Sequence, residues 1–158
     1  MNDTLQEFGE LGLGSRLNRL SDAIMKEIQS VYDTLHIDFD PYLFPVFKII
    51  TTDNSVTNAK IKEQLHYTQP AITQALKKLV DKKLISFKMD KTDKRKKTIK
   101  LTKKGKLLHE EMIPVWTVID QQVKWLTEGS ANSLMRHLTH LENQLRKKPL
   151  RERILENL

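Results

Sequence analysis

The chain has 158 residues, of which 39% are hydrophobic and 30% charged, and it contains no cysteine. This length fits one ordinary domain or two small parts that share a core, and the lack of cysteine excludes a disulfide scaffold and thiol chemistry. The sequence has no run of eighteen apolar residues, and its first residues lack the basic and then apolar pattern of a signal peptide. We therefore expect a cytoplasmic protein.

The positive charge is concentrated in the middle of the chain. The net charge is +7, and residues 56–105 contain fifteen Lys and Arg against four acidic residues, whereas the rest of the chain contains twelve against sixteen. An even scatter of lysines would suit solubility alone. A basic centre between slightly acidic flanks is instead typical of a site for a polyanion such as a nucleic acid.

The first predicted helix is long and amphipathic, with Ser15 as a candidate N-cap. Its apolar residues recur in steps of three and four, at Leu13, Leu17, Leu20, Ile24, Ile28, Val31 and Leu35. A loop over 36–40 follows, and Asp40 before Pro41 is typical of a second helix start. Because Pro45 would lose a backbone hydrogen bond inside a helix, the alternative is a helix from about 44 to 52.

Two short helices with a tight turn between them are predicted next. Thr57 is a candidate N-cap for the first helix, His66 and Tyr67 form the turn, and Thr68 is a candidate N-cap for the second, with Pro70 in its first turn. The residues expected to face inward are Ile72, Leu76, Leu79 and Val80. The polar residues expected on the opposite face are Gln69, Thr73, Gln74 and Lys77. This arrangement predicts a helix-turn-helix.

A β-hairpin and further helices complete the prediction. Residues 85–89 and 98–101 alternate as strands do, around a polar and basic tip over 90–97. Thr102 is a candidate N-cap for a long helix that Pro114 should bend. Another amphipathic helix is predicted over about 134–145, and a short one after Pro149.

The predicted fold class is mainly α with a small β-hairpin wing. A winged helix-turn-helix domain over 41–105 lies between an N-terminal dimerisation helix region, 1–40, and C-terminal dimerisation helices, 106–158. The apolar stripes at both ends are too extensive for one small core to cover. They are most simply buried against a second copy of the chain.

Three groups of residues resemble the MarR family of bacterial regulators. They are the predicted recognition helix and the residues leading into it (65–79), the wing and the Leu-Thr-x-x-Gly sequence after it (93–95 and 99–105), and the segments 13–20 and 44–47. The family usually has Gly before its first wing strand, where this chain has Lys83. Because Gly suits a left-handed helix end, Lys83 indicates a different or strained cap.

The resemblance implies a homodimer whose recognition helices enter successive major grooves of a pseudo-palindromic operator, and we expect this regulator to be a repressor. The resemblance also implies that Arg95 enters a minor groove, oriented by Asp93, and that a small aromatic or lipophilic effector weakens DNA binding. The residues that could line an effector pocket, but could equally be plain core, are Tyr32, Phe39, Phe47, Met112 and Trp116.

The expected DNA contacts combine a base-reading helix with basic side chains. Gln74 could pair with adenine, and Lys77 could reach guanine or phosphate. The predicted DNA-binding residues are Thr68, Gln69, Thr73, Gln74, Lys77, Lys78, Lys94, Arg95 and Lys96. The sequence offers no constellation of nucleophile and base, so we predict no enzyme activity and no cofactor. His137 and His140 leave a metal site conceivable, and a non-specific nucleoid or RNA-binding protein is the alternative function.

Overall fold

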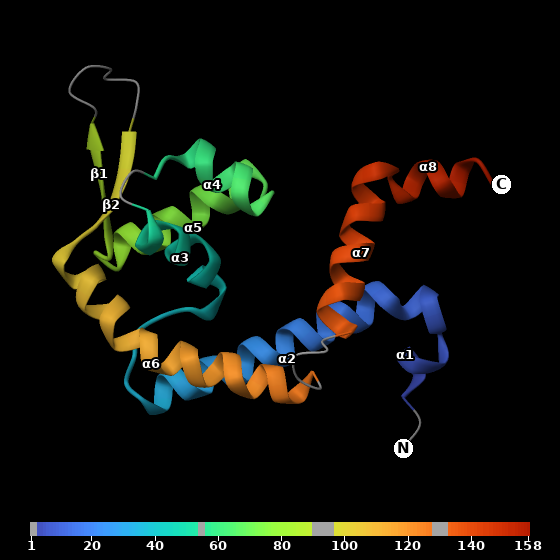
Figure 1. The fold of residues 1–158 in the computed structure, drawn as a ribbon, viewed down its shortest axis with the longest axis horizontal. Helices are drawn as coiled ribbons and strands as arrows, with labels where there is room; N and C mark the ends of the chain where they lie inside the picture. Colours follow the sequence, from blue (N-terminus) through green and yellow to red (C-terminus); the bar gives the residue numbers. More distant parts are fainter. Residues whose placement is uncertain (1–2, 54–55, 90–96, 128–132) are drawn as a thin grey trace. The chain divides into compact units, whose positions relative to one another are not determined.

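A computed structural model describes residues 3–53, 56–89, 97–127 and 133–158 (Figure 1). The elements are α1 (Thr4–Glu7), η1 (Gly9–Gly12), α2 (Leu13–Thr34), η2 (Pro41–Leu43), α3 (Phe44–Thr52), α4 (Asn58–Leu65), α5 (Gln69–Asp81), β1 (Ile85–Met89), β2 (Lys97–Leu101), α6 (Lys103–Leu126), α7 (Ser133–Lys147) and α8 (Leu150–Leu155), where η marks a 3-10 helix. The predicted fold class, helical with a two-stranded antiparallel hairpin, is confirmed.

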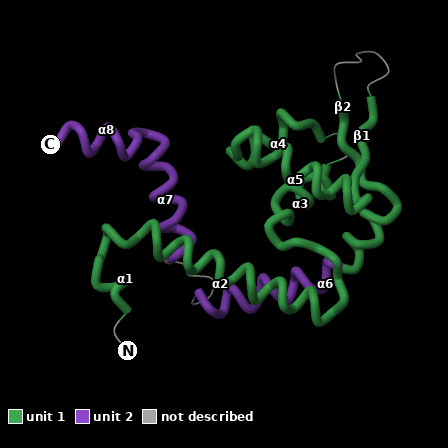
Figure 2. Tube along the Cα trace, turned by 180° about the vertical axis from the view of Figure 1, so that it is seen from behind, with its two compact units in different colours: residues 1–111 green, residues 112–158 purple. Residues whose placement is uncertain are grey.

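The chain forms two compact units, residues 1–111 and residues 112–158, which Figure 2 colours separately. The first unit contains the helices α1 to α5, the hairpin and the first turns of α6. The second contains the rest of α6 together with α7 and α8. Within the described ranges, no helix has the length and apolar character needed to cross a membrane.

Helix α2 is the long helix that the apolar spacing predicts, but it begins differently. Gly12 occupies its N-cap position and Ser15 lies inside the helix, so the predicted cap is wrong. The preceding elements α1 and η1 were not predicted. A Cβ on Gly12 would stand 2.6 Å from the carbonyl oxygen of Leu5, and Arg19 of α2 pairs with Asp3, the N-cap of α1. These contacts pack the first turns of the chain against α2.

The core of the first unit contains a row of aromatic rings from three segments. Tyr32 of α2, Phe39 of the loop and Phe47 of α3 are at most 2% exposed. Their ring centroids are 6.1 Å apart for Tyr32 and Phe39 and 5.2 Å apart for Phe39 and Phe47. The imidazole of His109 follows, 6.5 Å from Phe47. Burial, and next the ammonium of Lys48, lower the pKa of His109, so this core favours the neutral imidazole.

Of the two helix starts that the sequence allowed, at Pro41 or at about residue 44, the structure has the later one. The Asp40 carboxylate accepts a hydrogen bond from the backbone N–H of Tyr42 at 3.0 Å and caps the turn η2, in which Pro41 is the first residue. Helix α3 then begins at Phe44, so Pro45 falls in its first turn, where the missing N–H costs little. Asp40 is therefore a confirmed cap, but of a 3-10 turn that leads into the helix.

The helix-turn-helix forms as predicted. Thr57 and Thr68 are the N-caps of α4 and α5, each accepting a hydrogen bond from the backbone N–H three residues further on. His66 ends α4 in the left-handed conformation, with φ of 54°, and so turns the chain toward α5. Pro70 lies in the first turn of α5.

The wing consists of β1 and β2, with Ile85 opposite Leu101 and Met89 opposite Lys97. Val56 adds an isolated bridge to Ile99 on the other edge of β2, which the sequence did not predict. Both of these residues are buried, so the bridge ties the residue that precedes the N-cap of α4 to the hairpin. The tip, residues 90–96, lies outside the described residues.

The hairpin and α6 meet at Thr102 and Gly105. The Thr102 side-chain oxygen accepts a hydrogen bond from the backbone N–H of Gly105 at 3.0 Å, which confirms it as a cap, and its hydroxyl donates to the carbonyl oxygen of Lys83 at 2.6 Å. A Cβ on Gly105 would stand 2.0 Å from the carbonyl oxygen of Leu84. The first turn of α6 therefore packs on the backbone of Leu84 at a distance that only glycine allows.

Lys83 directly follows Lys82, the C-cap of α5, and has a φ of 59°. It therefore adopts the left-handed conformation at the position where the MarR family usually has glycine. The backbone N–H of Lys83 donates to the Val80 carbonyl, and that of Leu84 donates to the Leu79 carbonyl, the two hydrogen bonds of a Schellman motif. A side chain other than glycine costs about 1–2 kcal/mol in this conformation.

We expect Lys83→Gly to raise the free energy of unfolding by about 1 kcal/mol. Glycine removes the conformational cost in the folded chain, and the greater entropy that it gives the unfolded chain offsets part of this gain. Urea unfolding followed by circular dichroism measures the change. Lys83→Ala is the matched control, since it removes the charge but keeps the strained conformation. Equal stability of the two variants would contradict the strained cap.

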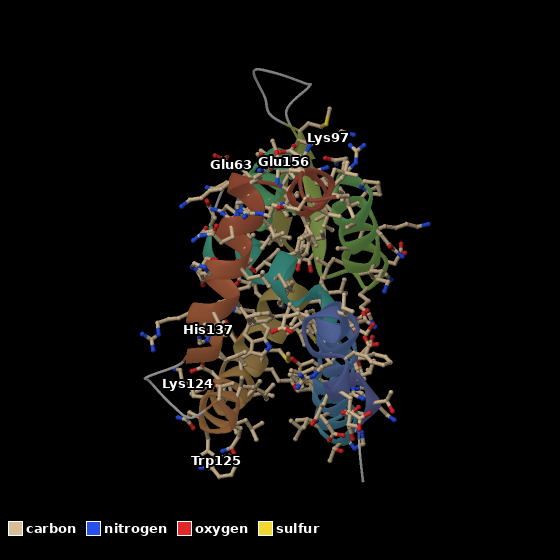
Figure 3. The ribbon with its side chains drawn as sticks, turned by 90° about the vertical axis from the view of Figure 1, so that its right-hand side faces the viewer. Glu63, Lys97, Lys124, Trp125, His137 and Glu156 are labelled. Atoms are coloured by element: carbon tan, nitrogen blue, oxygen red, sulfur yellow. The ribbon has the colours of Figure 1, made fainter. Side chains whose placement is uncertain are left out.

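In the second unit, α6 continues through Pro114 and ends at Leu126. Trp125 is 76% exposed, and its side chain points away from the ribbon of α6 in Figure 3. Helix α8 follows Pro149 and is joined to α7 by Arg153, which donates a hydrogen bond to the carbonyl oxygen of Gln144 at 3.1 Å.

Candidate nucleic-acid interface

Helix α5 presents a polar face to solvent. Its buried side is formed by Ile72, Leu76 and Leu79, which are at most 2% exposed. The predicted polar residues are all exposed, namely Gln69, Thr73, Gln74 and Lys77. Val80, which we expected to face inward, is 36% exposed, so that placement is wrong. It lies close to the C-terminal end of α5, at the margin of the buried stripe.

The hydrogen-bonding groups on this face are only partly used within the chain. The Thr68 oxygen accepts from the backbone of Ala71 at 3.4 Å, which leaves its own hydroxyl hydrogen available to a phosphate. The Thr73 hydroxyl donates to the Gln69 carbonyl at 2.9 Å, which leaves its oxygen lone pairs and methyl group exposed. The Gln74 amide forms no hydrogen bond with the described residues and presents both a donor and an acceptor to a base edge.

The two predicted lysines of α5 differ in their surroundings. Lys77 is exposed and pairs with none of the described carboxylates. The Nζ of Lys78 lies 3.0 Å from an Oδ of Asp40, and Lys82 forms a second ion pair with Asp38. Sequence reasoning missed these acidic partners, because they lie 38 and 44 residues away and no local pattern relates them to α5.

The predicted wing contacts Lys94, Arg95 and Lys96, together with Asp93, lie outside the described residues and stay predictions. At the base of the tip, Lys97 is the first residue of β2 and is labelled in Figure 3. Lys88 and Lys100 are also exposed on the two strands. The described part of the hairpin thus carries basic side chains next to the helix-turn-helix, which suits contact with phosphates.

A groove of about 600 Å³ opens in the first unit, between α2 and the start of η2. Its lining combines carboxylates, an amine and apolar groups: Asp22, Met25, Lys26, Gln29, Ser30, Asp33, Asp40, Pro41 and Tyr42. The Tyr42 hydroxyl donates to the Asp22 carboxylate at 3.1 Å. Desolvation and then this hydrogen bond raise the pKa of Tyr42, so the phenol stays a hydrogen-bond donor.

None of the residues predicted to line an effector pocket borders this groove. Tyr32, Phe39, Phe47 and Met112 are at most 2% exposed, and Trp116 is half-buried. For Tyr32, Phe39 and Phe47 the structure favours the alternative that they are plain core, because their rings pack against one another in edge-on and tilted contacts in the core of the first unit.

The histidine pair considered for a metal also remains unsupported. His137 and His140 are exposed on α7. Over the described ranges, His, Asp and Glu side chains nowhere gather in a group of three that could hold a metal ion.

Comparison with known proteins agrees with this arrangement. Residues 44–97, which span α3 to the start of β2, match the MarR family. No curated protein matches the chain with significance. Among solved structures, the S. aureus MepR–DNA complex is similar with a TM-score of 0.67 and 20% identity over 85% of this chain and 96% of that one.

Two further structures show the same likeness. A mutant of MarR from E. coli complexed with operator DNA has a TM-score of 0.63 and 23% identity over 92% of this chain and 98% of its own. BpsR of Bordetella bronchiseptica, whose DNA binding is regulated by 6-hydroxynicotinic acid, has a TM-score of 0.63 and 20% identity over 84% of this chain and 91% of its own. At these identities the likeness establishes the fold. Over residues 44–97 the chain is thus similar to the MarR family, and over most of its length it shares the fold of these solved regulators.

Proposed function

We propose that this chain is a cytoplasmic, sequence-specific repressor that binds a pseudo-palindromic operator as a homodimer. The proposal depends mainly on the exposed polar face of α5. On this face the Gln74 amide, which forms no hydrogen bond with the described residues, lies beside Thr73 and Lys77. A helix with polar side chains of this kind fits the major groove and can read base edges. The basic strands of the wing supply phosphate contacts beside it.

The homodimer is supported by apolar side chains that the single chain leaves exposed. In α2 and just after it these are Leu13, Leu20, Ile24, Val31 and Leu35, and in the second unit they include Ile113, Val118, Trp125, Leu134, Leu150 and Ile154. Such extensive apolar surface on a monomer favours burial in an interface. A twofold dimer would present two recognition helices to two half-sites about one helical turn apart.

A small aromatic or lipophilic effector belongs to the same proposal. The groove beside α2 has a volume within the range of small-molecule sites, and the DNA binding of BpsR, which is similar in fold, is regulated by 6-hydroxynicotinic acid. Met25, Pro41 and Tyr42 offer apolar and aromatic surface there, and the Tyr42 phenol offers a polar contact. We propose this groove as the effector site.

Selection from a random duplex library tests the proposed function against the alternative of a non-specific nucleoid or RNA-binding protein. We expect the full-length protein to enrich one pseudo-palindromic sequence, and its affinity for that sequence to fall steeply with salt. Each neutralised phosphate contributes about −0.9 to the slope of log affinity against log salt concentration. We expect several such contacts per subunit. Binding to every duplex alike, or preferentially to RNA, would favour the alternative.

A further inference from the structure

Two lysines continue the DNA-facing side of α5 toward its C-terminal end. Lys78 follows Gln74 by four residues, and Lys82 follows Lys78 by four, so the three side chains lie along one stripe of the helix. Both lysines are engaged by carboxylates of the loop that precedes η2: Lys78 by Asp40 at 3.0 Å, and Lys82 by Asp38. The two lysines that follow Gln74 on this stripe therefore already form ion pairs with acidic residues of the same chain.

Asp40 is held in place before any DNA arrives. One of its oxygens accepts the hydrogen bond from the Tyr42 backbone that caps η2, and the other contacts Lys78. Its side chain is 28% exposed, against 49% for that of Lys78. A carboxylate fixed by a backbone hydrogen bond loses little conformational freedom when it forms an ion pair.

We propose that Asp40 is an intrachain competitor of DNA phosphates for Lys78. The proposal rests on the DNA binding proposed above. A carboxylate oxygen and a phosphate oxygen offer the same charge and hydrogen-bonding chemistry to an ammonium group, so a phosphate that binds Lys78 must displace or share Asp40. Because phosphate contacts carry no sequence information, the competition lowers the affinity for every duplex and not the preference among them.

Asp40→Asn tests the competition, because asparagine caps a helix start about as well as aspartate but carries no charge. We expect the variant to bind a random-sequence duplex about two- to fivefold more tightly per subunit at low salt, the range that one exposed ion pair spans. We also expect the salt slope to become steeper by up to about 0.9 per subunit. Asp40→Ser, a second uncharged cap, should behave in the same way.

Two controls distinguish the loss of the Asp40–Lys78 ion pair from the effect of a changed net charge. Asp120→Asn removes the same charge and also an ion pair, that of Asp120 with Lys124 on α6, at a residue that does not line the proposed effector groove, and it should tighten binding much less. In a Lys78→Gln background, Asp40→Asn should give no gain. Unchanged or weaker binding by both Asp40 variants, or a gain that persists without Lys78, would overturn the proposal.

The outcome is independent of sequence-specific recognition. Heparin, a sulfated polyanion, serves as a second probe and should be bound more tightly by the Asp40 variants in the same way as the random duplex. If the library selection enriched no sequence, the proposed function would fail, but the competition would still be measured on these two probes. If a sequence were enriched while the Asp40 variants bound both probes like the parent, only the competition would fail.

Discussion

Replacing Phe47 by alanine is expected to lower the free energy of unfolding by about 3–5 kcal/mol. Phe47 is fully buried and contacts rings from two other segments, Phe39 at 5.2 Å and His109 at 6.5 Å between centroids. Alanine would leave a cavity where the loop between α2 and η2, helix α3 and the first turns of α6 meet. The loss should be visible in urea unfolding followed by far-ultraviolet circular dichroism.

Phe87→Ala is the matched control for this experiment. It deletes the same atoms from β1, where the phenyl ring is 46% exposed, and we expect a change within about 1 kcal/mol. If the two variants were equally stable, Phe47 would not be part of the core that the ring distances describe.

The largest expected effect on recognition comes from Gln74→Ala. The Gln74 side chain is exposed on the outer face of α5, and alanine removes both the donor and the acceptor of its amide. A lost bidentate contact with a base costs about 1–3 kcal/mol of discrimination, roughly 5- to 150-fold. We therefore expect weaker binding to the selected operator and nearly unchanged binding to a random duplex, measured in competition titrations.

Gln122→Ala makes the same chemical change at an exposed position of α6, outside the helix-turn-helix, and should leave both affinities unchanged. Equal weakening of operator and random duplex by Gln74→Ala would mean that Gln74 contacts the backbone and that the recognition face lies elsewhere on α5.

Most of the fold could be predicted because it depends on local chemistry. Thr57, Thr68 and Thr102 each cap the helix that follows them, since a hydroxyl can accept the free backbone N–H of a first turn wherever it occurs. The alternation of side chains likewise predicts β1 and β2, because a strand exposes its two faces in turn. Such signals lie within a few residues and need no knowledge of the rest of the chain.

The features that escaped prediction depend on contacts between distant residues. The bridge of Val56 to Ile99 and the ion pair of Lys78 with Asp40 join segments about forty residues apart. Lys78 has the residue type and spacing of a phosphate contact, and only the folded chain brings a carboxylate to it. The polar face of the candidate site was therefore predictable, whereas its internal electrostatic partner was not.

The positions of the two tryptophans have a spectroscopic consequence. Trp116 and Trp125 are the only indoles in the chain, and both belong to α6 within residues 112–158. Indole fluorescence therefore monitors this one helix, and the strongly exposed Trp125 should dominate the red edge of the emission. The winged helix-turn-helix contains no indole and contributes nothing to such a spectrum. An optical signal from the residues proposed to face DNA therefore requires a fluorophore introduced there or a label on the duplex.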